Sequence, residues 1–313
     1  TAPVCQESIV MSLLWIPVTI AAAFFQNLRS AIQRQLKTDL SDMGAASVRF
    51  IYAWPFALLG LGITLGFGYA LPEPSVAFAI WVITGSIAQI TFTFLLMWLF
   101  SLSNFTVGTA LSKTEVIQIA VLQVILLQET ISPLATVAVL VATVGVLVMT
   151  AAKTKLSLGG LASGFLQKST AVGLACGFFL GLSAVLFRGA LVSLEGESVL
   201  IKSTYTLAVA TVLQSSIMVV WLRRFQPGQI TRTFSNWRIS LSVGFSGWIA
   251  SNCWFVAFAL TNVAFVRALG QVELLFTFLA SVLIFREKVT LTEIVGVLLL
   301  ISGIVVLVLE KAS

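Results

Sequence analysis

The stretch "ALSKTEVIQ", residues 110–118, places a lysine and a glutamate two positions apart inside an otherwise apolar run. A second stretch, "ALGQVELLF" at residues 268–276, repeats this frame 158 positions later, with Glu273 where Glu115 stands in the first. Ionisable residues inside apolar segments are rare, because a charge is costly within a membrane. A matched pair of them calls for an explanation in the fold.

The composition around these stretches is that of a polytopic membrane protein. Of the 313 residues, 58% are hydrophobic and 10% are charged, and the formal net charge is +6. A soluble domain has about 25% charged residues. The lysines and arginines lie between apolar runs and form no basic patch, so nucleic acid is not an expected partner. The sequence has no histidine, and its three cysteines lack disulfide or metal-site spacing, so we expect no metal or cofactor.

Ten apolar segments have about the length of a transmembrane helix. They cover residues 12–32, 45–67, 77–100, 106–127, 134–151, 171–193, 201–222, 239–260, 264–285 and 291–309. The first has no basic region before it and is interpreted as a span rather than a targeting peptide. The break at 153–170 is rich in Gly, Ser and Lys and is the expected linker between two halves, 1–152 and 171–313. The sequence thus predicts an all-α polytopic membrane protein with ten transmembrane helices.

The two halves align with each other. A shift of 158 matches residues 102–148 with 260–306 without a gap, including Asn104 with Asn262 and Glu115 with Glu273. Each half holds five predicted spans, and because five is odd the second half must enter the membrane from the opposite side. We therefore expect two inverted five-helix repeats, an architecture that many secondary transporters build around a site at the bilayer midplane.

The segments "TEVIQIAVLQVILLQETISP" (114–133) and "VELLFTFLASVLIFREKVTLTEIVGVLLLISGIVVL" (272–307) resemble the repeat of the drug/metabolite transporter superfamily, in its ten-helix EamA-type branch. This resemblance implies transport or exchange of small metabolites, and both termini in the cytoplasm. Members of that family often carry a proline directly after the first glutamate, where Val116 and Leu274 stand here. Without that proline, we expect the fourth and ninth spans to be unbroken.

The buried charges are the first candidates for substrate contact. Lys113 and Glu115 would lie about 200° apart around a continuous helix, so each must find a partner elsewhere or face an aqueous cavity. The alternative is a structural ion pair, for example Glu115 with Arg29 or Arg49. The predicted substrate-binding residues are Lys113, Glu115, Arg267, Glu273, Gln271, Asn252, Trp98 and Trp254. For the amides and tryptophans, ordinary helix packing is the competing explanation.

Three further arginines, Arg29, Arg49 and Arg188, are predicted to act in gating, and Arg188 aligns with Arg29 at a shift of 159. Each lies near a helix end, so its guanidinium group could instead reach the lipid headgroups. Two small-residue stripes, Gly173-Gly177-Gly181 and Gly62-Gly66, are interpreted as close-packing surfaces.

Five cations and two anions within the spans favour a substrate with a carboxylate or phosphate, and the glutamates leave room for an amine. We therefore predict alternating-access transport of a zwitterionic or anionic, amino-acid-like metabolite. The sequence contains no nucleotide-binding or hydrolase motif, which indicates a secondary transporter and not an enzyme. If protons drive it, a glutamate must carry them, since histidine is absent.

Two alternatives stay open: export of hydrophobic organic cations, with Glu115 and the deep tryptophans as the binding groups, and a non-transporting membrane scaffold. Orientation is also open. Most loop lysines and arginines follow odd-numbered spans, which by the positive-inside rule puts both termini outside, against the family resemblance. A cell or inner membrane is the expected location, and a monomer is compatible with the sequence.

Overall fold

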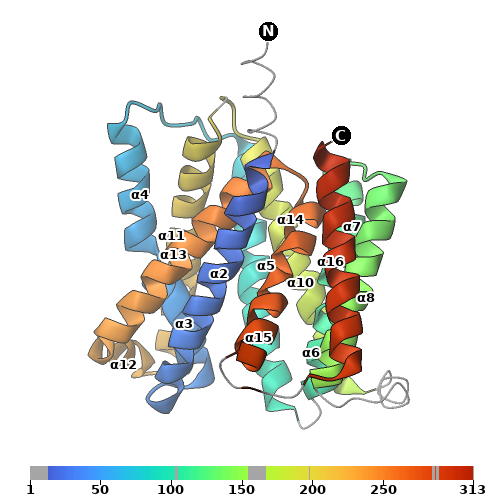
Figure 1. The fold of residues 1–313 in the computed structure, drawn as a ribbon. Helices are drawn as coiled ribbons and strands as arrows, with labels where there is room; N and C mark the ends of the chain where they lie inside the picture. Colours follow the sequence, from blue (N-terminus) through green and yellow to red (C-terminus); the bar gives the residue numbers. More distant parts are fainter. Residues whose placement is uncertain are drawn as a thin grey trace. The chain divides into compact units, whose positions relative to one another are not determined.

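The computed structural model describes residues 13–102, 105–153, 167–196, 198–283, 286 and 289–312, and within these ranges it consists of helices, turns and loops (Figure 1). The chain forms two compact units. Unit 1 comprises Thr1–Ile20, Thr91–Val185 and Thr261–Ser313, and unit 2 comprises Ala21–Ile90 and Leu186–Leu260. Each unit therefore combines segments from both halves of the sequence.

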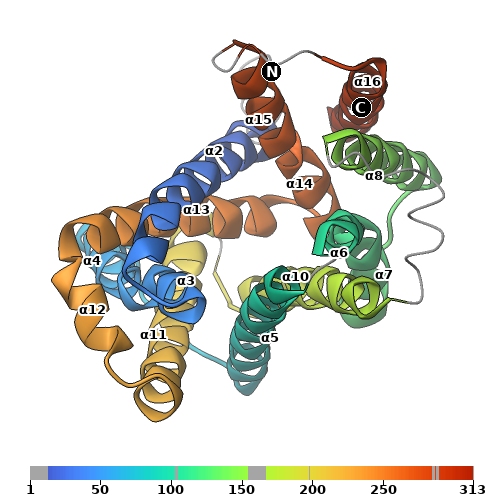
Figure 2. The same ribbon diagram turned by 90° about the horizontal axis from the view of Figure 1, so that it is seen from below.

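Unit 2 is built from helices that converge on a small apolar core. It contains most of α2 (Trp15–Arg34), η1 (Gln35–Thr38), α3 (Asp42–Ile51), α4 (Trp54–Gly66), the first part of α5 (Val76–Ser101), the end of α10 (Lys168–Val192), α11 (Val199–Phe225), α12 (Gln229–Ser235) and α13 (Trp237–Leu260). Leu36, Val48, Leu222 and Val243 are fully buried in its core. Figure 2 shows α3, α11 and α13 side by side, as their contacts require.

The second predicted span is interrupted between α3 and α4. Pro55 has no N–H to donate to the carbonyl of Ile51, and its ring crowds that carbonyl, so the helix stops at Ile51 and restarts at Trp54. The hydroxyl of Ser215 on α11 donates to the carbonyl of Phe50 at 2.5 Å. A neighbouring helix thus supplies a hydrogen bond to the end of α3.

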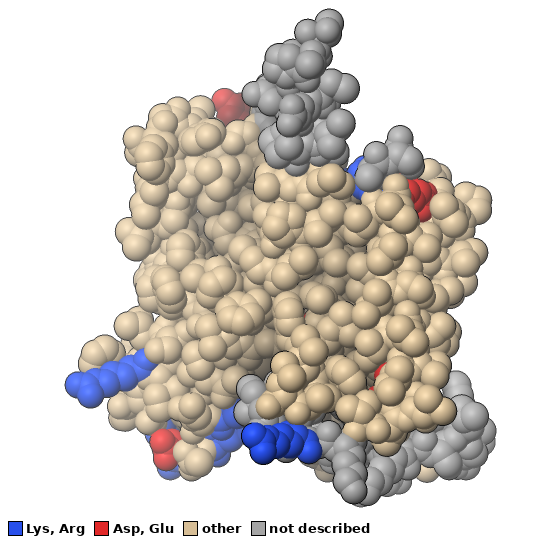
Figure 3. Space-filling model, in the orientation of Figure 1, with Lys and Arg blue, Asp and Glu red and all other residues tan. Residues whose placement is uncertain are grey.

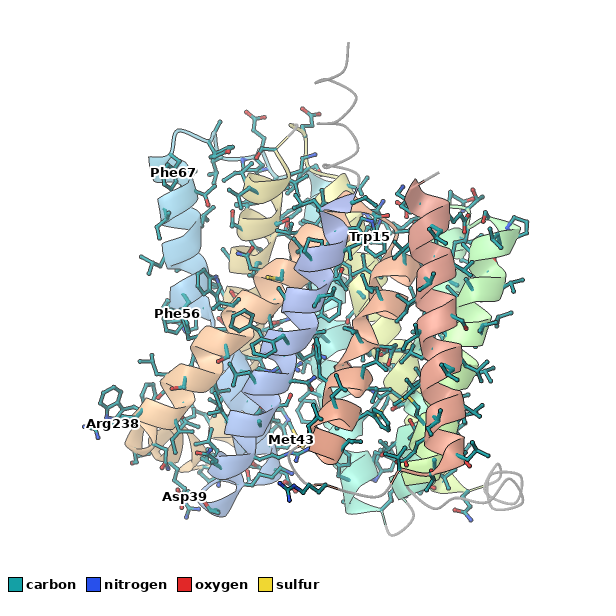
Figure 4. All side chains as sticks on the ribbon, viewed as in Figure 1. Trp15, Asp39, Met43, Phe56, Phe67 and Arg238 are labelled. Atoms are coloured by element: carbon teal, nitrogen blue, oxygen red, sulfur yellow. The ribbon has the colours of Figure 1, made fainter. Side chains whose placement is uncertain are left out.

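One end of unit 2 is strongly basic. It carries Arg34, Lys37, Arg223, Arg224, Arg232 and Arg238, with Asp39 and Asp42 as acidic residues. The Tyr52 hydroxyl donates to the carbonyl of Thr233 at 3.1 Å, which ties α12 to this end. The other end of unit 2 has few charged residues among those described. Glu73 lies in the connection after α4, Glu195 in the connection after α10, and Lys202 in the first turn of α11. Figure 4 labels Asp39 and Arg238 at the basic end and Phe67 at the other, and in Figure 3 the uncharged surface of the helices lies between them.

Unit 1 brings together the two segments with the matched glutamates. It contains the first residues of α2, the end of α5, α6 (Phe105–Ser112), α7 (Glu115–Leu127), α8 (Pro133–Lys153), most of α10, α14 (Val263–Gly270), α15 (Val272–Leu283) and α16 (Leu291–Ala312). α8 starts with Pro133 after Ser132, whose hydroxyl accepts from the Ala135 N–H at 3.0 Å. α16 starts with a capping box in which Thr290 and Glu293 bond each other's backbone N–H groups.

Two pairs of helices in unit 1 are related by a spacing of 158 residues. α14 has the bounds of α6 shifted by 158 residues, and α16 begins 158 residues after α8. α8 and α16 pack side by side (Figures 1 and 2). A Cβ on Gly145 would lie 2.5 Å from the backbone nitrogen of Leu300, and one on Gly303 would lie 2.7 Å from that of Ala142. Along the contact, residue numbers increase on α8 where they decrease on α16, so the two helices run antiparallel.

Eight helical stretches among the described residues are long and apolar enough to cross a membrane, so the chain is an all-α, multi-pass integral membrane protein. They are Asp42–Gly66, Val76–Ser101, Val107–Leu127, Pro133–Ala152, Lys168–Val192, Val199–Phe225, Trp237–Leu260 and Leu291–Lys311. They correspond to eight of the ten predicted spans. The other two predicted spans contain α2, and α14 with α15, which are helical but are not among the eight.

The close-packing interpretation is confirmed for one glycine stripe and is wrong for the other. A Cβ on Gly173 would lie 2.2 Å from the carbonyl of Gly108, so α10 and α6 touch through their backbones. Around Gly62 and Gly66 there is no atom within 4 Å of an added Cβ among the described residues. Those two glycines lie on open faces of α4.

Candidate functional site

The prediction of unbroken fourth and ninth spans is wrong, because both helices are interrupted beside the matched glutamates. The N–H groups of Lys113 and Thr114 bond carbonyls three residues back, each at 3.1 Å, and the N–H of Gln271 does the same at 3.2 Å. Lys113 and Gln271 are 158 positions apart, so the two breaks fall at equivalent places in the repeat. A tighter turn of this kind often marks a hinge or a strained sequence.

Hydroxyl groups and a close neighbour explain the first break where proline does not. Ser112 and Thr114 donate their side-chain hydroxyls to carbonyls three residues back, at 2.8 and 2.7 Å, which offers the backbone an alternative to regular helix. On the facing helix α10, a Cβ on Gly177 would lie 2.8 Å from the carbonyl oxygen of Ser112. Because Gly177 has no side chain, the backbone of α10 can approach the interrupted turn that follows Ser112.

Two ion pairs join the broken helices. Lys113 Nζ lies 2.9 Å from Glu273 Oε1, and Arg267 Nη2 lies 2.5 Å from Glu115 Oε1. The side chains of Lys113 and Glu273 are 25% and 17% exposed, whereas those of Arg267 and Glu115 are 11% and 3% exposed. Gln271 Nε2 also donates to Glu115 Oε1 at 3.2 Å. The Arg267–Glu115 pair is therefore deeply buried, and the Lys113–Glu273 pair is partly exposed.

The contacts follow the repeat. Lys113 contacts Glu273, and Gln271, which stands at the position equivalent to Lys113, contacts Glu115. Where the first half supplies a lysine, the second half supplies a neutral amide, and Arg267 provides the cation that Glu115 needs. The cluster is thus symmetric in position and asymmetric in charge.

Lys113 and Glu115 each pair with a residue of α14 or α15, which is the structural ion pairing that the sequence left open as the alternative to a cavity. The premise of a continuous helix is wrong, because Lys113 lies in the break. The example of a structural pair was also wrong in its partner: Glu115 pairs with Arg267 rather than with Arg29 or Arg49. No alignment of the two stretches could have shown this, because Arg267 is matched by Thr109 in the first half.

Sequence reasoning missed Gln123. Its side chain is fully buried, and its Nε2 donates to Asn262 Oδ1 at 2.5 Å while its Oε1 accepts from the Ala264 N–H at 3.3 Å. It therefore caps the start of α14 from another helix, in place of the missing side-chain cap by Asn262. The repeated asparagine pair was the signal in the sequence that could have pointed to this joint.

The remaining predicted substrate residues lie in different surroundings. The ring of Trp98, in unit 1, is 44% exposed and lies 4.9 Å from Lys168 Nζ. Asn252 and Trp254 belong to unit 2, where Asn252 is half-buried. Trp254 is 7% exposed, and its Nε1 donates to Gln26 Oε1 at 3.1 Å.

Unit 2 contains a second candidate site, a cavity of about 30 Å³. Two of the predicted gating residues, Arg29 from α2 and Arg49 from α3, line it together. The rest of the lining is Phe50, Ala53, Gln89, Leu207, Ala210, Thr211, Gln214, Gly247, Ser251 and Phe255. The charge of the described lining residues is therefore entirely positive.

The third predicted gating residue has a different place. Arg188 Nη1 donates to the carbonyl of Phe258, two residues before the end of α13. Carbonyl groups in the last turn of a helix lack intrahelical donors and attract cations. Arg188 therefore stabilises a helix end, although the repeat makes it the equivalent of Arg29.

Comparison with known proteins agrees with this architecture. Residues 168–309 match the EamA-like transporter family, which confirms the resemblance seen in the sequence. A solved crystal structure superposes on the chain with a TM-score of 0.69 at 15% sequence identity, covering 97% of each chain, and shows that the two share a fold. No curated protein matches the sequence significantly.

Proposed function

Residues 168–309 belong to the EamA-like transporter family, whose members are secondary transporters and not enzymes, and from this premise we propose a function for the whole chain. The chain moves a small zwitterionic or anionic metabolite, amino-acid-like in its charges, across a membrane by alternating access. Its two inverted five-helix repeats are residues 1–152 and 171–313. Of the predicted linker at 153–170, residues 154–166 lie outside the described residues, and α10 already begins at Lys168.

The proposal of ten spans requires two membrane-crossing segments in addition to the eight apolar helical stretches. α2 has 20 residues and is about 30 Å long, which matches the hydrocarbon thickness of a bilayer. α14 and α15 together run from residue 263 to 283, a similar length. Five spans in each half make the repeats inverted. The spacing of 158 residues between α6 and α14 and between the starts of α8 and α16 supports this arrangement, as does the antiparallel packing of α8 on α16.

The observation that carries the substrate assignment is the partly exposed Lys113–Glu273 pair at the two equivalent helix breaks. A zwitterion can replace such a pair charge for charge, because its carboxylate binds the lysine while its ammonium group binds the glutamate. The exchange leaves no unpaired charge in the membrane, where one would be costly. The Gln271 side chain donates to Glu115 of the deeper Arg267–Glu115 pair, and that pair holds the helices together.

The same contacts disfavour the two alternatives. In the cation-exporter alternative Glu115 is the binding group, but Glu115 is held by Arg267 and by Gln271 and is 3% exposed. A non-transporting scaffold needs no partly exposed ion pair at an interrupted helix. In secondary transporters, by contrast, interrupted helices usually surround the binding site.

Counterflow in proteoliposomes tests the proposal. Vesicles loaded with an unlabelled amino acid should accumulate the same amino acid in labelled form from outside. Vesicles loaded with an unlabelled quaternary amine should not accumulate the labelled amine. Lys113→Gln and Glu273→Gln should each lower the rate strongly, because a neutral side chain cannot balance a charged substrate group. Lys168→Gln, which removes a lysine near Trp98, is the matched control and should leave the rate unchanged. Absence of counterflow for every amino acid would refute the function proposed here.

A further inference from the structure

We propose that the cavity lined by Arg29 and Arg49 is a binding site for a soluble oxyanion, a carboxylate or phosphate group, rather than part of a gate. This proposal concerns a site in unit 2, distinct from the Lys113–Glu273 pair of unit 1. It deepens the proposed function, because an anionic or zwitterionic metabolite carries such a group, but binding at the site can be measured without transport.

The cavity gathers groups suited to an oxyanion from five helices. Two guanidinium groups supply paired N–H donors in a fork whose geometry matches carboxylate and phosphate oxygens. Gln89, Thr211, Gln214 and Ser251 add neutral hydrogen-bonding groups to the lining. Gln214 Nε2 donates to Gln89 Oε1 at 2.7 Å, which orients both amides across the cavity wall. Because the two arginines share one small space and repel each other, an anion between them lowers the energy of the arrangement.

The arginines are supported in their positions. The guanidinium carbon of Arg49 lies 4.5 Å from the ring centroid of Phe50, which also lines the cavity. The stem of Arg29 passes over Gly247 of α13, where a Cβ would lie 3.2 Å from Arg29 Cδ. A larger residue at that position would push the Arg29 side chain aside. The glycine therefore makes room for the cation that the cavity needs.

The volume indicates which part of a ligand binds. A cavity of about 30 Å³ has room for about two water molecules, because each needs roughly 10–15 Å³. A carboxylate or one face of a phosphate fits this space, and a whole metabolite does not. The site therefore binds a charged end group, with the rest of the ligand outside the cavity.

The repeat supplies an internal comparison. Arg188 is the equivalent of Arg29 in the second half, and its guanidinium group donates to the carbonyl of Phe258 at the end of α13. Of two related arginines, one stabilises a helix end and the other lines a cavity with a second cation. The two related arginines therefore have different surroundings.

The test uses the purified full chain and measures protection of arginines from phenylglyoxal by mass spectrometry. Inorganic phosphate and acetate should protect Arg29 and Arg49 in a saturable manner, whereas chloride at equal ionic strength should not. Arg238, which is exposed at the basic end, should react equally under all conditions. Because this measurement uses the unaltered protein, it does not depend on whether a variant folds. Absence of protection, or protection by phosphatidylglycerol alone, would overturn the proposal.

Variants give a second, independent measurement. Arg29→Gln and Arg49→Gln should each weaken phosphate binding, seen as phosphate-dependent thermal stabilisation, by about tenfold or more, since a hydrogen bond to a charged group contributes about 1.5–3 kcal/mol. Arg238→Gln should bind phosphate like the unaltered protein. Unchanged binding in both cavity variants would contradict the proposal. Counterflow that persists without oxyanion protection refutes only the cavity, and protection without any counterflow refutes only the transport function.

Discussion

Replacing Gly145 by alanine should destabilise the protein, although alanine is the better helix former. A Cβ at this position would lie 2.5 Å from the backbone nitrogen of Leu300 and 2.8 Å from the carbonyl oxygen of Gly296. Both atoms belong to the backbone of α16, so no side chain can turn away. α8 and α16 would have to move apart, and contacts would be lost along the pair.

The magnitude follows from a comparison with Gly62, which lies within α4. Gly62→Ala should stabilise the protein by about 0.5–1 kcal/mol, because alanine is favoured in helices and no described atom lies within 4 Å of the added Cβ. Gly145→Ala gains the same helix propensity but adds an overpacking cost of about 1–3 kcal/mol. The difference between the two variants should therefore be about 1–3 kcal/mol, with Gly62→Ala the more stable.

The assay is thermal unfolding of both purified variants in the same detergent, monitored by tryptophan fluorescence and by loss of the monodisperse peak in gel filtration. Gly62→Ala should unfold at or above the temperature of the unaltered protein, and Gly145→Ala below it. Equal unfolding temperatures for the two alanine variants would show that the α8–α16 contact is not as close as described, and would refute the reasoning.

Three further predictions concern the charges. Lys113→Glu places like charges side by side and should lower the unfolding temperature, whereas adding Glu273→Lys should restore it; a double variant no better than the single one would contradict the ion pair. Arg267→Ala leaves a buried carboxylate without its cation and should cost about 3–5 kcal/mol in chemical denaturation, and a loss below 1 kcal/mol would argue against this pairing. If the basic end of unit 2 faces the cytoplasm, an impermeant maleimide applied to intact cells should label Glu73→Cys and leave Lys37→Cys unlabelled, in a background without the native cysteines. The reverse pattern would support the orientation implied by the family.

The helices and the repeat could be predicted because both rest on local patterns. Long apolar runs fix where helices form, and the matched frames around Glu115 and Glu273 give the 158-residue spacing at which the elements recur. The presence of partners for the buried charges was also predictable, since a lone charge is costly in a membrane. These features follow from residue type and order alone.

The helix breaks and the identities of the partners were not predictable, because they depend on packing. The break at Lys113 arises from hydroxyls of Ser112 and Thr114 and from the close approach of α10 at Gly177, a contact between distant segments. Arg29 and Arg49 share a cavity because α2 contacts α13 and α3 packs against α11 and α13. Sequence spacing treats them as two separate arginines near helix ends.

The close seam between α8 and α16 has a consequence for the architecture. Each helix comes from a different half of the chain, and each presents glycines to the other's backbone. Neither half can therefore complete unit 1 by itself, and a gene divided between α8 and α10 would encode two fragments that meet as an obligate heterodimer. Pull-down of a tagged fragment from co-expressing cells should recover its untagged complement, and either fragment produced alone should be degraded.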